Sequence, residues 1–226
     1  MGTGLPRSVE VIVASAALFV VAPLIVISAI LVLMTSRGGV LFKQTRIGQY
    51  GRRFTVLKLR SMTAGVRGPE VTMANDSRVT TVGRLLRAYK VDELPQFWNV
   101  IRGDMSLVGP RPEVPRYVDT GDPLWRTVLS ARPGLSDPVT LELRNEEALL
   151  GTMGADAANF YTTTLVPYKL LGNAAYLRRR TWRTDLAVLL KTVRRIAVPN
   201  STTQPTAAML RSSVEQRLLE SPNQAI

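Results

Sequence analysis

An apolar segment from Val11 to Met34 constrains this chain more than any other feature, because it contains no charged residue. Glu10 precedes it directly and Arg37 follows it. About 20 apolar residues in a helix are enough to cross the hydrocarbon core of a bilayer, so the segment is long enough to enter a membrane. A cleavable signal peptide fits poorly, because the run is too long and no cleavage site of small residues leads into polar sequence. We therefore expect a membrane-bound protein.

Pro23 lies near the centre of this segment. Proline removes one backbone hydrogen bond and clashes with the preceding turn, so we expect the helix to be kinked or broken there. Basic residues flank both ends, with Arg7 before the segment and Lys43 and Arg46 after it. Because basic flanks mark the cytoplasmic side, this pattern favours a re-entrant helix that enters one leaflet and returns. An ordinary kinked transmembrane helix is the alternative.

The 226-residue chain contains neither cysteine nor histidine. Disulfides, thiolate metal sites and every mechanism that uses a histidine base or ligand are therefore excluded. Proton transfer or nucleophilic attack would have to come from Asp, Glu, Lys, Tyr, Ser or Thr side chains. The net charge of +12 predicts an anionic partner, which could be nucleic acid, an acidic membrane surface or a phosphorylated substrate.

The residues after the apolar segment predict a small β-hairpin and a short helix. Residues 40–48 and 53–62 have the composition of short strands, with a turn at residues 48–51. On the second strand Lys58 and Arg60 share one face, and a solvated surface is the simplest explanation for such a pair. Residues 63–75 predict a loop and residues 82–89 a short helix.

The stretch from Tyr89 to Pro112 contains the strongest functional signal. It begins with adjacent carboxylates, Asp92 and Glu93, continues with apolar residues at helical spacing, and ends in a turn rich in glycine and proline that presents Arg111. One interpretation is structural: Asp92 caps a helix and Glu93 favours the positive end of its dipole. However, adjacent helical residues point in different directions, so the two carboxylates would not duplicate each other. Two carboxylates beside a cationic loop suit a metal-bound phosphate ester.

A series of short motifs follows the same order as in a known family. They are Phe42–Gly48, Leu57–Met62, Asp76–Thr80, Gly83–Arg87, Asp92–Gln96, Asn99–Pro112 and Arg132–Gly134. Together they resemble the bacterial sugar transferases, small membrane-associated phosphoglycosyl transferases that start glycan assembly on a polyprenyl phosphate carrier. The resemblance covers about residues 11 to 197. The chain is similar to the minimal, monotopic catalytic form, without the further membrane helices and N-terminal domain of larger relatives.

This resemblance implies transfer of a sugar-1-phosphate from a nucleotide sugar, expected to be a UDP-sugar, to polyprenyl (undecaprenyl) phosphate with release of UMP. Such a reaction initiates exopolysaccharide, capsule, lipopolysaccharide O-antigen or glycoprotein assembly. It implies that Asp92 is a nucleophile forming a covalent phosphosugar intermediate, with Glu93 as its partner. Both carboxylates would hold Mg²⁺, which needs only one or two carboxylates plus substrate phosphates. The cations expected around the phosphates are Lys58, Arg60, Arg87, Arg111 and Arg132.

After Gly134 the chain departs from the commoner family pattern, in which Gly-Trp-Ala-Gln is followed by a Gly-Arg pair. Residues 136–147 instead predict a strand ending in a helix start. The departure leaves the sugar and the nucleotide contacts open. Residues 160–176 and 177–198 predict two helices, and the second, with Trp182 among many arginines, fits the interface of an anionic membrane. A tail rich in Ser, Thr, Gln and Pro follows, with a short helix expected at residues 209–219.

These observations predict an α+β fold that is mostly helical. Residues 1–36 would form the membrane-inserted helix. Residues 37–199 would form a compact catalytic domain on the cytoplasmic face of the cell membrane, with a small β-hairpin and interfacial amphipathic helices, and residues 200–226 a flexible tail. The expected partners are the nucleotide sugar, polyprenyl phosphate and membrane lipids, and the sequence does not give the oligomeric state.

Two other functions are compatible with parts of this pattern. A catalytically silent membrane scaffold could share the fold, because fold alone does not establish activity. A nucleic-acid-binding protein would explain the positive charge, but recognised motifs and aromatic residues interleaved with cations are absent from the sequence. We therefore expect no nucleic-acid partner.

Overall fold

The structure, a computed structural model, describes residues 3–36, 38–66, 68, 72, 76–143, 145–198 and 205–220. The described chain is mostly helical with two small sheets, which confirms the predicted composition of the fold. The α-helices and strands, in chain order, are α1 (Arg7–Thr35), β1 (Leu41–Ile47), β2 (Arg53–Leu59), α2 (Thr81–Ala88), α3 (Gln96–Arg102), β3 (Ser106–Val108), α4 (Pro123–Leu129), β4 (Gly134–Ser136), α5 (Glu146–Met153), α6 (Ala157–Phe160), α7 (Val166–Arg178), α8 (Trp182–Ala197) and α9 (Ala207–Glu220). The shorter turns are the 3₁₀ turns Gln49–Gly51, Val91–Glu93, Pro115–Tyr117 and Gly154–Asp156 and the π-helical turn Tyr161–Leu165.

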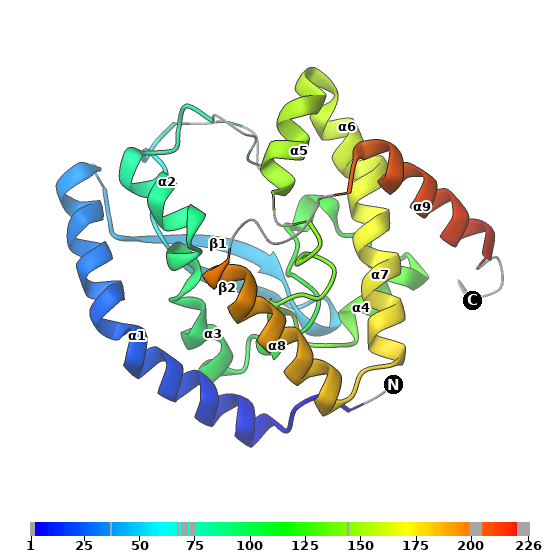
Figure 1. The fold of residues 1–226 in the computed structure, drawn as a ribbon, viewed down its shortest axis with the longest axis horizontal. Helices are drawn as coiled ribbons and strands as arrows, with labels where there is room; N and C mark the ends of the chain where they lie inside the picture. Colours follow the sequence, from blue (N-terminus) through cyan, green and yellow to red (C-terminus); the bar gives the residue numbers. More distant parts are fainter. Residues whose placement is uncertain are drawn as a thin grey trace.

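The strands β1 and β2 form the predicted hairpin, which runs through the middle of the molecule (Figure 1). They pair antiparallel, with Leu41 opposite Leu59. The connection requires positive φ at Tyr50 (57°) and Gly51 (75°), and glycine adopts that conformation without steric cost. The hairpin therefore holds Lys58, near the end of β2, at the boundary between the protein core and the cavity described below.

A second, two-stranded sheet pairs β3 with β4 in parallel, with Ser106 opposite Gly134. Its close approach depends on glycine, because a Cβ on Gly134 would lie 2.1 Å from the backbone nitrogen of Gly109. The pairing places the loop that presents Arg111 against the segment beginning at Arg132. We did not predict these strands, since elements of three residues are too short to show alternation.

Helix α1 is continuous from Arg7 to Thr35, although it contains Pro23. Figure 1 shows it bent along one edge of the molecule, so the helix is bent and not interrupted. Its large apolar side chains are mostly solvent-facing, with Phe19 82% and Met34 77% exposed. It is the one described helix that is long and apolar enough to cross a membrane. Because so little of its apolar surface is buried in the protein, a core role does not explain its composition; its insertion in a membrane stays a prediction.

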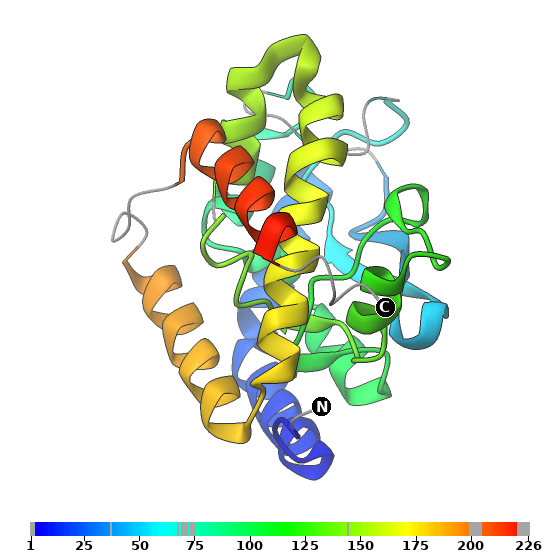
Figure 2. The same cartoon turned by 90° about the vertical axis from the view of Figure 1, so that its right-hand side faces the viewer.

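Two large apolar clusters hold the helices around the hairpin. The first joins α4, α7 and α9, and Phe160 and Leu165 within it are completely buried. The second joins β2, α3 and β3 to α1 through Ala14 and to α8 through Val188. Figure 2 shows α9 beside α7, where Leu210 is buried. This confirms the short helix expected at residues 209–219.

The sequence predicted a strand within residues 136–147, and this prediction is wrong. β4 ends at Ser136, residues 138–143 and 145 lie in turns, and α5 begins at Glu146. Leu141 packs against one apolar cluster and Leu143 belongs to the other. The alternating leucines therefore reflect a turn between two cores, a pattern that resembles strand alternation.

The two helices predicted near the C-terminal end are confirmed as α7 and α8. A capping box at Thr181 starts α8, in which the Thr181 hydroxyl accepts a hydrogen bond from the backbone N–H of Thr184. One face of α8 is apolar and exposed, with Trp182 51% and Leu190 64% exposed, while Val188 is buried. This pattern supports the predicted amphipathic helix, and its contact with a membrane stays a prediction.

Candidate active site

Asp92 and Glu93 lie in the 3₁₀ turn that follows Lys90, whose backbone is left-handed with φ of 57°. Helix α3 begins only at Gln96, and Pro95 occupies its N-cap position. The helix start predicted at Asp92 is therefore wrong, and so is the alternative that Asp92 caps this helix. Because Pro95 has no N–H, it cannot extend the α-helical hydrogen bonds back into the turn.

Glu93 binds two cations. Its Oε1 accepts hydrogen bonds from Lys58 Nζ at 3.0 Å and Arg111 Nη2 at 2.6 Å, and its Oε2 accepts one from Arg111 Nη1 at 3.3 Å. Burial alone would raise the pKa of Glu93, but the charges of Arg111, Lys58 and Lys90 outweigh it and hold the pKa well below its usual range. Glu93 is therefore a fixed negative charge.

Asp92 lies next to the ion-paired Glu93 but differs from it in hydrogen bonding and in the direction of its pKa shift. It is 5% exposed, and its Oδ1 has no hydrogen-bond partner among the described residues. Burial, and then the charge of Glu93, raise the pKa of Asp92, while Lys58 and Lys90 lower it in part. A buried carboxylate oxygen without a partner is costly, and carboxylates perturbed in this way concentrate at functional sites.

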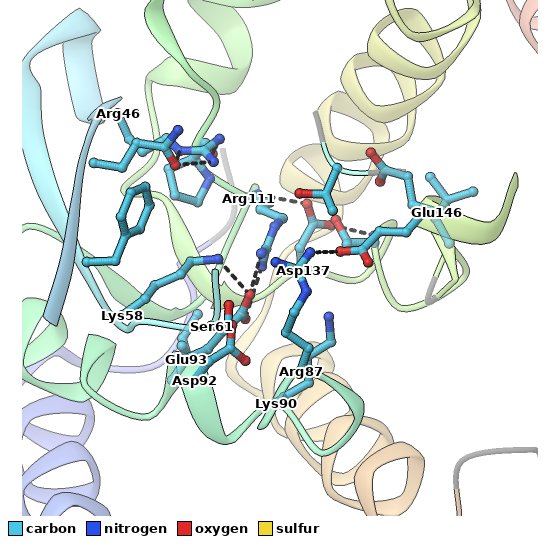
Figure 3. Close-up of a pocket in the computed structure, with 18 of the residues that line it drawn as sticks. Arg46, Lys58, Ser61, Arg87, Lys90, Asp92, Glu93, Arg111, Asp137 and Glu146 are labelled. Atoms are coloured by element: carbon cyan, nitrogen blue, oxygen red, sulfur yellow. Dashed lines mark hydrogen bonds and ion pairs between the residues drawn. The ribbon is translucent and has the colours of Figure 1, made fainter. Parts of the chain in front are cut away.

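The two carboxylates line an open cavity of about 1560 Å³. Figure 3 shows Lys58 and Arg111 converging on Glu93, and Arg87 and Lys90 lying on the other side of Asp92. The structure thus brings together these predicted site residues along one cavity: Lys58, Arg60, Arg87, Asp92, Glu93 and Arg111.

Arg132 is the predicted site residue that does not line this cavity. It is half-buried, and its backbone carbonyl lies against Gly109, where an added Cβ would come within 2.5 Å of the carbonyl oxygen. Its backbone therefore supports the Arg111 loop. Phosphate binding by the Arg132 side chain stays a prediction.

Arg60 and Arg87 extend the cationic lining in two directions. Arg60 follows β2, and its Nε is buried without a hydrogen-bond partner in the part of the chain that the structure describes. Arg87, in the last turn of α2, forms an ion pair with Glu147 on α5. This pair links α2 to α5 at the cavity. Lys58 and Arg60 both line the cavity, and the phosphate-binding role that the resemblance implies for them stays a prediction.

Asp137 is a residue of this site that we did not single out from the sequence. It is 4% exposed, and its Oδ2 accepts a hydrogen bond from the Arg111 backbone N–H at 2.7 Å, while its Oδ1 accepts one from Val139 N–H at 2.7 Å. The carboxylate therefore fixes the loop that presents Arg111. An aspartate before a proline, as in Asp137-Pro138, is a turn signal that could have identified it.

A second polar group holds the same loop from the opposite side. Arg46 Nη1 on β1 donates to Glu113 Oε1 at 3.3 Å and to the Pro112 carbonyl at 3.1 Å, and the Tyr161 hydroxyl donates to Glu113 Oε2 at 2.6 Å. Tyr161 lies in the π-helical turn, a distortion that often occurs at functional sites. Burial and Glu113 raise the pKa of Tyr161, so its hydroxyl stays protonated and donates.

Two further buried carboxylates join the helices to the strands of the site. Glu10 on α1 is 2% exposed and accepts hydrogen bonds from the Ser106 hydroxyl and, at 3.2 Å, from Leu107 N–H on β3. Arg7, one turn earlier, donates to the Met105 carbonyl at 3.2 Å. The start of α1 is therefore attached to the strand that leads into the Arg111 loop.

Asp185 makes the corresponding attachment for α8. It is completely buried and accepts hydrogen bonds from Leu5 N–H at 3.0 Å, from Arg180 Nη2 at 2.9 Å and from the Tyr176 hydroxyl. Arg180 also donates to the Val108 carbonyl at 2.8 Å. The sequence suggested no role for Asp185, and the structure shows it joining α7, α8, β3 and the N-terminal segment.

The described residues contain no group of three or more His, Cys, Asp or Glu side chains that could hold a metal ion. Asp92 Oδ1 is available, whereas both oxygens of Glu93 already accept hydrogen bonds from cations. Magnesium commonly binds one or two carboxylates and completes its shell with water and substrate phosphates. Asp92 Oδ1 therefore fits as a carboxylate ligand of a magnesium ion whose remaining ligands would be water and substrate phosphates. A ligand from Glu93 stays a prediction.

Comparison of the sequence with known proteins identifies the family of this chain. The family model for bacterial sugar transferases matches residues 2–198. The chain belongs to the bacterial sugar transferase family. It is 38% identical over 192 residues to a UDP-glucose:undecaprenyl-phosphate glucose-1-phosphate transferase of Caulobacter vibrioides, an alignment that covers 83% of this chain and 67% of the relative.

Two further relatives match shorter stretches of this chain. A UDP-N-acetylgalactosamine-undecaprenyl-phosphate N-acetylgalactosaminephosphotransferase of Aeromonas hydrophila is 40% identical over 135 residues, which are 58% of this chain and 32% of the relative. The exopolysaccharide production protein ExoY of Rhizobium meliloti is 37% identical over 159 residues, covering 62% and 70% of the two chains. The chain thus matches only about a third of the Aeromonas relative.

Proposed function

We propose that this protein is a phosphoglycosyl transferase that moves a sugar-1-phosphate from a UDP-sugar to polyprenyl phosphate at the cytoplasmic face of the cell membrane. The proposal rests first on Asp92, whose buried Oδ1 accepts no hydrogen bond from the described residues and lies beside a cation-bound Glu93 in a cavity lined by further cations. The named activities of the relatives support the same reaction class. The product would be the lipid-linked sugar with which exopolysaccharide or a related glycan begins.

In the first step, Asp92 Oδ1 attacks the phosphorus that bears the sugar. A new bond forms between this oxygen and phosphorus, the bond to the other phosphate breaks, and UMP leaves with the electron pair. In the second step, an oxygen of polyprenyl phosphate attacks the same phosphorus and releases the Asp92 carboxylate. A carboxylate nucleophile in this role divides one difficult transfer into two easier ones. The attack requires ionised Asp92, although burial and Glu93 raise its pKa.

The surrounding cations supply the electrostatic stabilisation that phosphoryl transfer needs. Lys58 and Arg111 are held in place by Glu93, so they are oriented before any substrate binds. Asp92 and Glu93 would hold Mg²⁺ together with the substrate phosphates, and the ion would offset negative charge on the phosphates. A cation close to Asp92 also favours its ionised form. Because Glu93 accepts hydrogen bonds from Lys58 and Arg111 on both of its oxygens, it acts chiefly by positioning these two cations.

The cavity also has an apolar side, which suits a lipid acceptor. Val13 and Ala17 of α1 and Leu189, Val193 and Ile196 of α8 line it together with the cations. Both helices expose apolar residues on their outer faces. A polyprenyl phosphate could therefore place its phosphate among the cations while its chain follows α1 and α8 towards a bilayer.

The test is release of UMP by the full chain in lipid particles with Mg²⁺, undecaprenyl phosphate and either UDP-glucose or UDP-N-acetylgalactosamine, the donors named for two relatives. We expect UMP from the wild type and none from Asp92→Asn. A phosphosugar adduct should be detectable on the wild-type chain by mass spectrometry when the lipid acceptor is left out.

UDP as the product would show an ordinary glycosyl transfer and exclude the covalent mechanism. Normal turnover by Asp92→Asn would remove this residue as the nucleophile. A wild-type chain that binds UDP-sugars but releases nothing with any donor would indicate the catalytically silent scaffold.

A further inference from the structure

Two polar atoms in the cavity play no part in the proposed chemistry. They are Asn173 Oδ1 on α7 and Thr140 Oγ1 in the turn after β4, and both are buried without a hydrogen-bond partner among the described residues. Both residues line the same cavity as Asp92. Asn173 is 3% exposed, so its unpaired oxygen is a buried acceptor that is costly to leave unsatisfied.

The orientation of the Asn173 amide follows from its neighbour. Asn173 Nδ2 donates to Asp137 Oδ2 at 3.1 Å. The same Oδ2 accepts from the Arg111 backbone N–H and is therefore an acceptor, so the NH₂ group must face Asp137 and the carbonyl oxygen must face away from it. Oδ1 is therefore fixed as an acceptor.

Thr140 is placed by the same carboxylate. Its backbone N–H donates to Asp137 Oδ1 at 3.1 Å, which leaves the side-chain hydroxyl free of the turn. Helix α7 comes close to this turn because residue 172 is glycine, where a Cβ would lie 2.7 Å from Val139 Cγ2. Asp137 thus holds Thr140 and Asn173 in fixed positions relative to each other.

Asp137 also connects this pair to the phosphate-binding part of the cavity. The Oδ2 atom that accepts from Asn173 accepts from the Arg111 backbone N–H at 2.7 Å as well. Figure 3 shows Asp137 and Glu146 on the side of Arg111 opposite to Lys58. Carboxylates and free acceptors on this side disfavour phosphate and suit groups that donate hydrogen bonds.

We propose that Asn173 Oδ1 and Thr140 Oγ1 form a donor-recognition subsite that accepts hydrogen bonds from O–H or N–H groups of the nucleotide sugar. This inference rests on the proposed function. The donating group could belong to the sugar or to the uridine, which have the same hydrogen-bonding chemistry. In both cases Asp137 fixes the position of the subsite relative to Arg111, so that a correctly bound donor places its phosphates beside Asp92.

The experiment measures UMP release and UMP binding for the full chain in lipid particles, with UDP-glucose and UDP-N-acetylgalactosamine as donors. Thr140→Val removes the hydroxyl but keeps the backbone N–H to Asp137, and Asn173→Ala removes the amide oxygen. We expect kcat/KM for the accepted donor to fall about tenfold for each lost hydrogen bond. Thr140→Ser should retain near wild-type kcat/KM, because it keeps the hydroxyl.

Two controls separate binding from folding. Thr152→Val changes an exposed threonine whose hydroxyl donates only to the Leu149 carbonyl at 2.7 Å, and it should leave kcat/KM unchanged. Thermal unfolding midpoints show whether Asn173→Ala disturbs the Asp137 network, and Thr140→Val provides the test if it does.

Binding of UMP, which lacks the sugar, identifies the source of the donated hydrogen. Weaker turnover with unchanged UMP affinity assigns the subsite to the sugar, and a parallel loss of UMP affinity assigns it to the uridine. If Thr140→Val and Asn173→Ala both keep wild-type kcat/KM and UMP affinity, the subsite is wrong. A wild type that neither releases nor binds UMP would overturn the proposed function itself, and this inference with it.

Discussion

Asp92 and Asp185 are both aspartates that the fold buries almost completely, but they differ in how well they are hydrogen-bonded. Asp185 receives hydrogen bonds on both oxygens, from Leu5, Tyr176 and Arg180. Asp92 has a buried Oδ1 that forms no hydrogen bond with any described residue. The first arrangement uses a charge to join four parts of the chain. The second keeps a charged atom available, at a cost in stability that only binding or chemistry would explain.

The same contrast separates the two members of the acidic pair. Glu93 is saturated by Lys58 and Arg111, and its pKa lies well below its usual range. Asp92, its neighbour in sequence, has a raised pKa. Adjacent carboxylates therefore have opposite pKa shifts because their environments differ, which is a general way for a site to prepare two acids for different functions.

The largest effect that would test this contrast is expected from Asp92→Asn. UMP release should fall by about 10³-fold or more, since the variant lacks the nucleophile, equivalent to at least about 4 kcal/mol of transition-state stabilisation. Stability should not fall. A carboxyl whose pKa is raised by folding binds its proton more tightly in the native state, so its contribution to stability declines as the pH rises above its ordinary pKa of 3.8.

Thermal unfolding of Asp92→Asn at neutral pH checks the second half of this prediction, and its midpoint should equal or exceed that of the wild type. A clear decrease would mean that Asp92 has a stabilising contact like those of Asp185, and the contrast between the two aspartates would be lost.

The next effect is expected from Asp185→Asn. Removing this charge leaves Arg180 buried without its partner, so the free energy of unfolding should fall by about 3–5 kcal/mol. The folded fraction should keep its kcat, because Asp185 does not line the cavity. Unfolding midpoints and UMP release measured on the same samples test both points. Asp119→Asn, at an exposed position, is the control and should change stability by no more than about 0.5 kcal/mol.

A smaller effect is expected from Lys58→Met, which removes one cation from Glu93 and leaves Arg111 in place. UMP release should fall about 100-fold, as it does when one stabilising donor is removed from an active site. Because Lys58 lowers the pKa of Asp92, the acid limb of the profile of kcat/KM against pH should move to higher pH. Lys43→Met on the exposed part of β1 controls for net charge. An acid limb that stays in place would show that Asp92 does not limit the rate at low pH.

The smallest effect is expected from Tyr176→Phe, which deletes one of the donors to Asp185 and keeps the ring. The free energy of unfolding should fall by about 1.5–3 kcal/mol, the usual range for a hydrogen bond to a charged group. Comparison of the unfolding midpoint with that of Asp185→Asn shows how far the remaining bonds from Arg180 and Leu5 support the carboxylate. A loss as large as that of Asp185→Asn would mean that the tyrosine, and not the ion pair, is the principal partner.

The sequence predicted the hairpin, the apolar helix and the acidic pair with most of the cations placed beside it, because each depends on local pattern or on residues that form part of a motif. The sequence could not show that Asp92 and Glu93 differ in hydrogen bonding and in the direction of their pKa shifts. Their difference arises from Lys58 on β2 and Arg111 on a loop, and these reach Glu93 only through tertiary packing. The alternating Leu141 and Leu143 misled the strand prediction, because each leucine packs in a different core.

Asp137 and Asp185 show a second limit. Both are buried carboxylates whose partners are distant in sequence, such as Arg111 for Asp137 and Leu5 for Asp185. An isolated aspartate in a sequence is usually expected at the surface or in a turn. Only the pairing of β3 with β4, which depends on Gly109 and Gly134, brings the loops close enough for Asp137 to hold Arg111.

The attachment of Glu10 to Ser106 and Leu107 has a practical consequence for anyone who wishes to study the catalytic part in water. Deleting residues 1–35 to gain solubility would leave the Ser106 hydroxyl and the Leu107 amide without their acceptor Glu10 and would expose the side of α3 against which α1 packs. It would also remove the Leu5 amide from Asp185. The start of the hydrophobic helix is therefore part of the support of the loop that carries Arg111. Inhibitor screening and crystallisation should therefore begin with the full chain in a lipid or detergent environment.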